Sequence, residues 1–305
     1  MRSGGPGTGI WLMDGSIYFF RGYFGIPPSL VDQKGYPTNG VLGFAQALLR
    51  LLHVHPARGC AVTFDESLGS GFRHGLYAAY KANRALPDAD IRRQFRYCKQ
   101  LCDLLGIPCW ASRQFEADDL LATLASRSKL STTIYSKDKD LHQLVSKKTS
   151  IQDARQDNDQ EAPWDLTRVQ HHYGFIPALL PDYQALVGDV SDNVPGVPGI
   201  GAKTARRLIA RYGTLEQVLG SVPDWQEDGL GLPPTGRVAQ GLAEYGERAL
   251  RMRELVRLVT SVPLPTGATR RAGMDSKGLS RWLIRTGLER RLRPTIARSP
   301  VEFGI

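Results

Sequence analysis

The sequence predicts an α/β domain built on a parallel sheet, followed by a mainly helical domain. In the first half, short apolar runs alternate with segments of helical periodicity, an order typical of a parallel sheet with helices on both faces. After a polar, acidic stretch at Asp153–Ala162 the strand signals fade, and Gly and Pro punctuate helical patterns instead. We therefore expect an α/β domain over 1–160, a helical domain over 161–261 and a basic segment over 262–305.

The expected elements of the first half follow from their periodicity. Short runs rich in apolar and β-branched residues predict strands at Ile10–Asp14, Cys60–Asp65, Ile107–Ser112 and Thr132–Ser136. Apolar residues at helical spacing predict helices at Val41–His53, Ile91–Leu105 and Asp118–Ala125. Beyond them, helices are expected between Leu166 and Leu258, with a loop-like stretch at Pro223–Gly236.

The charge balance favours a polyanionic partner. A formal net charge of +9 and a pI near 9.5 fit nucleic acid most simply, although RNA or an anionic surface would fit equally well. The end of the chain is rich in arginine, with apolar residues between Arg281, Arg285, Arg290, Arg291 and Arg293. This pattern fits a basic amphipathic helix and a solvated tail equally well.

Other bulk features exclude several classes. No apolar run approaches the ~20 residues of a membrane span, and the first residues lack the basic-then-apolar order of a secretory signal. We therefore expect an intracellular protein without a membrane partner. Its four cysteines form no CxxC pair and lie in apolar or helical stretches, which favours buried thiols over a zinc site.

Acidic residues cluster where the parallel strands are expected to end. Sites in open α/β sheets form at the carboxyl ends of the strands, so these side chains should meet at one edge. Five segments supply nine carboxylates: Asp14; Asp65; Glu116, Asp118 and Asp119; Asp138 and Asp140; and Asp189 and Asp192.

Crowded carboxylates indicate a metal centre. They repel one another unless cations neutralise them, and Mg²⁺ and Mn²⁺ prefer such oxygen ligands. Two ions about 4 Å apart can clamp the attacking and leaving oxygens of a phosphodiester hydrolysis. Any single cluster could instead complement a helix N-terminus or complete a turn. Five clusters together favour the metal centre.

The segment FRHGLYAAYKANR, from Phe72 onward, combines basic and aromatic residues. We expect a helix on which Tyr77, Tyr80, Lys81 and Arg84 recur at three- and four-residue spacing. Such a face suits base stacking and phosphate contact, and a solvated amphipathic helix explains it equally well.

The glycine-rich segment Gly196–Thr204 nearly spells a nucleotide-binding P-loop. Ala202 stands where the lysine should be and the segment follows a helical pattern, so ATP or GTP binding is excluded. Pro195–Ala205 instead resembles a helix–hairpin–helix-type turn, in which N–H groups at a helix start meet a phosphate without reading bases. A plain glycine turn between packed helices is the alternative.

Five segments, in order, resemble the bacterial and phage 5′→3′ exonuclease/flap endonuclease family, whose module also forms the N-terminal nuclease of bacterial DNA polymerase I. They are MDGSIYFFRGYFGIP, TFDESLGSGFRHGLYAAYKANR, FEADDLLATLA, SKDKDLHQLV and ALVGDVSDNVPGVPGIGAKTA. The resemblance implies a PIN-like nuclease domain with a helical arch at about 72–95. It also implies a duplex-gripping helix–three-turn–helix element at 195–205.

The resemblance further implies roles for individual residues. All nine carboxylates would be ligands of two Mg²⁺ or Mn²⁺ ions; Tyr80 would stack on a base, and Lys81 and Arg84 would face the scissile phosphate. A K⁺ ion is expected near the glycines. DNA contacts are expected from Arg73, Gly196, Gly199, Gly201, Lys203 and Thr204.

Together these features predict a Mg²⁺-dependent, structure-selective 5′-nuclease, a monomer acting on DNA with a 5′ end, flap or branch in replication or repair. Because no polymerase region precedes Ile305, we expect a stand-alone form of bacterial or phage origin. Two other classes are weighed. A PIN-like ribonuclease has no reason to carry Gly196–Ala205, and a non-catalytic binder of branched DNA does not need nine carboxylates.

Overall fold

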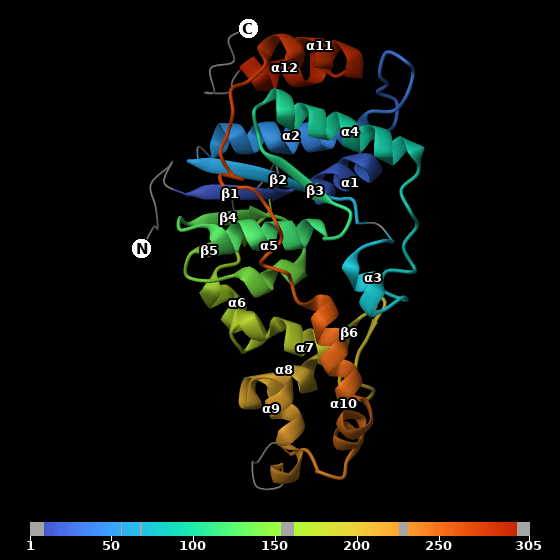
Figure 1. The fold of residues 1–305 in the computed structure, drawn as a ribbon, viewed down its shortest axis with the longest axis vertical. Helices are drawn as coiled ribbons and strands as arrows, with labels where there is room; N and C mark the ends of the chain where they lie inside the picture. The colour runs from blue at the N-terminus through green and yellow to red at the C-terminus, as the bar shows by residue number, and fades with distance from the viewer. Residues whose placement is uncertain (1–8, 56, 68, 154–161, 226–230, 298–305) are drawn as a thin grey trace.

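The computed structural model describes residues 9–55, 57–67, 69–153, 162–225 and 231–297. A sheet lies between two layers of helices, and a helical region extends from one side of this sandwich (Figure 1). The described helices include none that is long and apolar enough to cross a membrane. Cys60, Cys98 and Cys102 are buried free thiols as predicted, and Cys109 is a half-buried one.

Five parallel strands form the sheet, in the order β3-β2-β1-β4-β5. They are β1 (Ile10–Asp14), β2 (Gly59–Asp65), β3 (Cys109–Ser112), β4 (Thr132–Tyr135) and β5 (Thr149–Gln152). Four match the predicted strands; β5 was missed because TSIQ is short and half polar. In the register, Asp14 pairs with Thr63 and Met13 with Tyr135, so the carboxyl ends of the central strands align.

Helices α1 (Gly15–Gly25), α2 (Asn39–Val54) and α4 (Ala89–Leu104) cover one face, and α5 (Ala117–Arg127) covers the other (Figure 1). Helix α1, which was not predicted, packs backbone to backbone on α2. A Cβ atom built on Gly43 would lie 2.5 Å from the Cα of Gly22. This approach holds α1, and with it the end of β1, firmly against the sheet.

The arch segment differs from the predicted helix. Only α3 (Phe72–Leu76) is helical, and turns follow, with Lys81 at a φ of +52°. The chain docks on the loop after α7 instead of completing helical bonds. Lys81 N donates to Asp192 O at 2.9 Å, and Asn193 Nδ2 donates to Ala79 O at 2.7 Å. The aromatic and basic residues of this segment therefore share no helical face.

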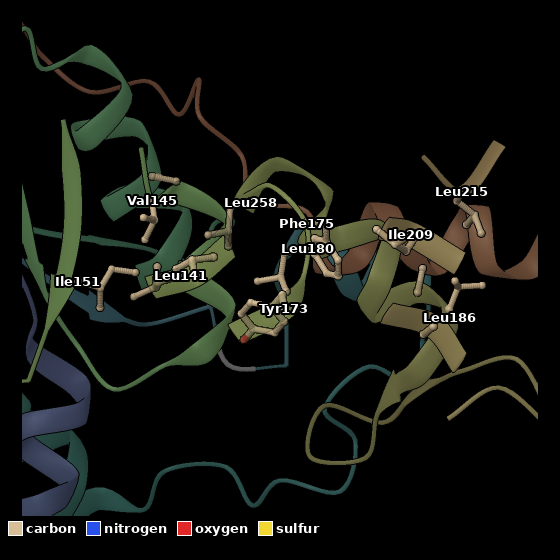
Figure 2. Packing of buried hydrophobic residues seen from close by; sticks show 14 of the residues in the cluster. Leu141, Val145, Ile151, Tyr173, Phe175, Leu180, Leu186, Ile209, Leu215 and Leu258 are labelled. Carbon is tan, nitrogen blue, oxygen red and sulfur yellow. The ribbon is translucent and has the colours of Figure 1, made fainter. Parts of the chain in front are cut away.

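The helical region follows the sheet. A short 3-10 helix, η1 (Lys139–Leu144), lies between β4 and β5. The elements of the helical region are α6 (Leu166–Tyr173), the 3-10 helix η2 (Pro177–Leu179), α7 (Leu180–Val187), the hairpin β6 (Gly188–Asp189) and β7 (Val194–Pro195), α8 (Ala202–Tyr212), α9 (Leu215–Gly220), the 3-10 helix η3 (Val222–Asp224) and α10 (Arg237–Val256). One apolar core runs from Ile151 of β5 and Leu141 of η1, through Tyr173 and Leu180, to Ile209 of α8 (Figure 2). The sheet and this region therefore share a core.

The arginine-rich end forms two helices, α11 (Ser276–Thr286) and α12 (Glu289–Ala297), that pack beside α2 and α4 (Figure 1). Leu279, Trp282, Leu283, Leu288 and Leu292 are all buried in the core on this side of the sheet. Of the two interpretations of this segment, the amphipathic helix is confirmed and the solvated tail is wrong, because the apolar residues of the pattern supply a full packing face.

Candidate active site at the carboxyl edge of the sheet

An acidic pocket lies at the carboxyl ends of the strands. Its volume is about 610 Å³, and part of the arch and the loop after α7 close over it. Eight of the nine predicted carboxylates line it: Asp14, Asp65, Glu116, Asp118, Asp138, Asp140, Asp189 and Asp192. The structure thus brings together carboxylates from five separate segments.

Several of these carboxylates also complete local turns. Asp14 caps α1 by accepting from Ile17 N at 3.2 Å, Asp65 accepts from Ser67 N at 3.0 Å, and Asp138 accepts from Asp140 N at 2.9 Å. The structural and functional interpretations weighed for these residues are therefore compatible. The turn bond fixes one oxygen and holds the carboxylate at the pocket.

Burial makes the charges of the pocket costly. Burial first, and then the nearby Asp138 and Asp65, raise the pKa of Asp14 to about 7. Burial, followed by Asp138, likewise raises the pKa of Asp140 to about 7 and that of Asp118 well above its usual range. A bound cation would relieve both penalties, and an all-oxygen donor set suits a hard divalent ion.

In the described part of the chain, no three His, Cys, Asp or Glu side chains are arranged to enclose one ion as they stand. Basic side chains occupy several of the carboxylates instead. Lys81 Nζ lies 2.8 Å from Glu116 Oε2 and 3.6 Å from Asp192 Oδ2, and Arg84 pairs with Asp192. Lys139, which the sequence analysis did not single out, lies 2.9 Å from Asp189 Oδ2.

Tyr80 points into this cluster rather than toward solvent. Its ring is 3% exposed, and its hydroxyl donates to Glu116 Oε2 at 3.2 Å. Burial and the Glu116 charge raise the pKa of Tyr80 above its usual range, so the hydroxyl stays a donor. In this arrangement the ring is not presented to a base.

Arg73 and Asp119, predicted as a DNA contact and a metal ligand, pair with each other in this structure. Arg73 is 2% exposed, and its guanidinium donates to both oxygens of Asp119, at 2.6 and 2.8 Å, and to Leu255 O. Asp119, fully buried, also accepts from Val259 N and Glu116 N. Four donors thus fill the acceptor positions of Asp119 in this arrangement, and the Arg73 guanidinium, which also lines the acidic pocket, is held by Asp119. The pair instead ties α3, the start of α5 and the end of α10 together.

The residues expected to contact DNA phosphates lie in two environments. Gly196 packs against the backbone of Val187, and Gly199, at a φ of +87°, lies against the Arg237 side chain, so close packing explains both glycines. Gly201 and Lys203 are exposed at the start of α8, and Thr204 is half-buried. The open backbone at Gly201 leaves that helix start accessible to a ligand.

The parallel sheet and the attached helical region match two protein-family models, one for each part of the chain. A family described as "5′-3′ exonuclease, N-terminal resolvase-like domain" matches residues 9–174. A second, "5′-3′ exonuclease, C-terminal SAM fold", matches residues 175–276. The chain belongs to the 5′-3′ exonuclease family.

Individual relatives agree with this placement. A 5′-3′ exonuclease of Aquifex aeolicus is 36% identical over 222 residues, which are 72% of this chain and 75% of the relative. DNA polymerase I of Bacillus subtilis is 31% identical over 273 residues, 88% of this chain. The chain spans only 30% of the length of that polymerase.

Solved structures share the fold. The T5 D15 protein, co-crystallized with metal ions, superposes with a TM-score of 0.62 at 21% identity, covering 95% of this chain and 98% of that one. The catalytic core of Rad2 in complex with DNA substrate gives a TM-score of 0.62 at 16% identity, covering 96% and 92%. At these identities, the likeness supports the architecture and not the individual contacts.

Proposed function

We propose that this protein is a divalent-metal-dependent 5′-nuclease that hydrolyses DNA phosphodiesters at or near a 5′ end, flap or branch. The observation that carries the proposal is the convergence of eight carboxylates from five segments on one pocket, beneath a loop bearing Lys81 and Arg84. Membership of the 5′-3′ exonuclease family supports the reaction type, and the T5 relative bound to metal ions supports the cofactor class.

The pocket residues would divide the work of the reaction. The eight carboxylates would hold two Mg²⁺ or Mn²⁺ ions, which supply charge neutralisation at the phosphate and a lowered pKa for the attacking water. Lys81 and Arg84, once released from Glu116 and Asp192, would donate to the phosphate oxygens on which charge develops. Stacking of Tyr80 on a base requires the same release, because its ring is now buried.

The start of α8 would hold duplex phosphates away from the cut. Gly201 exposes the first N–H groups of the helix, and Lys203 adds a positive charge beside them. Such contacts fix the position of the duplex without reading its sequence. A K⁺ ion near Gly196–Gly201 stays a prediction of the family resemblance.

One assay tests the proposal. A 5′-labelled flap, a nicked duplex, a plain single strand and an RNA flap are each incubated with the protein, with Mg²⁺ or with excess EDTA. We expect cleavage of the DNA flap or nicked duplex with Mg²⁺ only. Full activity in EDTA, preferred cleavage of RNA, or binding without any cleavage would each reject it.

A further inference from the structure

A row of four exposed arginines leaves the acidic pocket along α4 and α11 and contributes nothing to the fold core. Arg92 and Arg96 lie on α4, and Arg285 and Arg281 lie on α11. We call these four residues the arginine track. The proposed function gives it no role: α4 and α11 lie on the far side of the sheet from α8, where the duplex would be held (Figure 1).

The contacts between the two helices place the four side chains in line. Arg92, Arg96 and Gln100 are four residues apart, so they share one stripe of α4. Arg285 donates to Gln100 Oε1 at 2.7 Å and so takes the next place in the row. Helix α11 runs antiparallel to α4, since Asp275 N donates to Leu104 O, and Arg281 therefore follows Arg285.

The row begins at the pocket. Asp88 and Ile91, which precede Arg92, line the acidic pocket, whereas Gln100, Arg281 and Arg285 line a shallow cavity of about 430 Å³ at the other end. Arg92 and Leu104 lie roughly 18 Å apart along the axis of α4, from the rise of an α-helix per residue. One strand of a DNA duplex places about five phosphates along that length.

The track is positioned for an external anion rather than for an internal ion pair. Within the described residues, neither Arg92, Arg96 nor Arg281 has a carboxylate within 4 Å, whereas the neighbouring Arg93 pairs with Asp90. Asp103 and Asp275 flank the far end of the row and reduce its field there.

We propose that the arginine track binds the phosphate backbone of the substrate DNA on the far side of the cleaved bond from the duplex held at α8. The inference rests on the proposed 5′-nuclease function, and its structural basis is that the start of α4, at Asp88 and Ile91, lines the acidic pocket. A single-stranded flap and a second duplex arm present the same phosphates, and the substrates of the test separate these two sources.

The test compares two variants of equal charge in the full chain. The track variant carries Arg92→Gln, Arg96→Gln, Arg281→Gln and Arg285→Gln. The control variant carries Lys147→Gln, Lys148→Gln, Arg290→Gln and Arg291→Gln, exposed positions outside the row. Binding is titrated in Ca²⁺ at several salt concentrations for three DNAs: a duplex ending at the cut, the same duplex with a long 5′ flap, and one with a second duplex arm.

For at least one of the two extended DNAs, the track variant should bind at least tenfold more weakly near 0.1 M salt, with a salt slope lower by about 3. Its binding of the short duplex should match that of the control variant. Equal loss in both variants, or no loss on either extended DNA, would overturn the track. If the wild-type protein binds and cuts none of the DNAs, both proposals fail, whereas normal cleavage with an unaffected track variant rejects the track alone.

Discussion

Adjacent residues of α5 should respond in opposite ways to the same substitution. Asp118→Asn removes a charge that burial and the neighbouring carboxylates penalise, as the raised pKa of Asp118 indicates. The sign follows from linkage: a carboxyl whose pKa is raised on folding destabilises the fold at pH values above its unfolded pKa. Asp118→Asn should therefore leave the free energy of unfolding unchanged or raise it in EDTA at pH 7.

Asp119→Asn should instead destabilise the protein by about 3–5 kcal/mol, the usual cost of breaking a buried ion pair from one side. The amide would present donors to the guanidinium of Arg73, whose side chain is only 2% exposed. Replacing both partners, as in Arg73→Met with Asp119→Leu, should cost less than the sum of the single changes.

Urea unfolding with and without Ca²⁺ measures both effects. Ca²⁺ should stabilise the wild-type protein and the Asp119→Asn variant but stabilise Asp118→Asn less, because an ion that binds only the folded state adds to its stability. Cleavage of the flap by Asp118→Asn should fall by far more than tenfold, or ~1.4 kcal/mol. A stable Asp119→Asn variant that has lost its Ca²⁺ response would show that Asp119 is a ligand and that our assignment is wrong.

Three other expectations concern different parts of the molecule. Lys81→Ala should slow single-turnover cleavage at saturating enzyme with little change in the Kd for DNA. Lys203→Ala should weaken duplex binding and lower the salt slope of that binding by about one, with the single-turnover rate nearly unchanged. The reverse pattern would contradict the assigned roles. Gly43→Ala should destabilise the fold by roughly 1–3 kcal/mol in urea, because its Cβ would lie 2.5 Å from a Cα of α1. A hydrogen bond from Arg253 lowers the pKa of Glu216 to about 2. The Arg253–Glu216 pair should therefore stabilise the fold above about pH 4.5, and this stabilisation should be lost as the pH falls toward 2. Glu216→Gln should remove that part of the pH dependence of the free energy of unfolding, and an unchanged pH dependence would count against the pair.

The sequence predicted the acidic residues of the pocket better than it predicted the arch that closes over them. Asp14 and Asp65 could be placed because apolar runs mark where each strand ends, the alternation of strands and helices indicates a parallel sheet, and parallel strands end at one edge. Strand β5 and helix α1 were missed, since TSIQ carries little apolar signal and α1 depends on a backbone contact through Gly43 that no periodicity reveals.

The conformation of the arch was predicted wrongly, and the partner of Arg73 was missed, for a different reason. The spacing of Tyr80 and Lys81 suits a helix, but the hydrogen bonds that decide their conformation go to a loop more than 100 residues away. Arg73 reads as a surface cation in a basic segment, and only the fold shows Asp119 facing it. Contacts at long sequence separation, with no repeat or composition signal, lie outside what a single sequence can specify.

The charges of the pocket connect its closed arrangement to its proposed chemistry. Nine carboxylates, the eight above and Asp88, line the pocket with four cations, Arg73, Lys81, Arg84 and Lys139, so a negative excess remains even while the arch is docked. Under the proposed function, Glu116 would be among the residues that hold a divalent ion, and Lys81 now pairs with one of its oxygens. Lys81 released from Glu116 would be free to pair with a phosphate in the pocket. The buried Asp119, which accepts from Glu116 N and pairs with Arg73, holds the backbone of Glu116 in place.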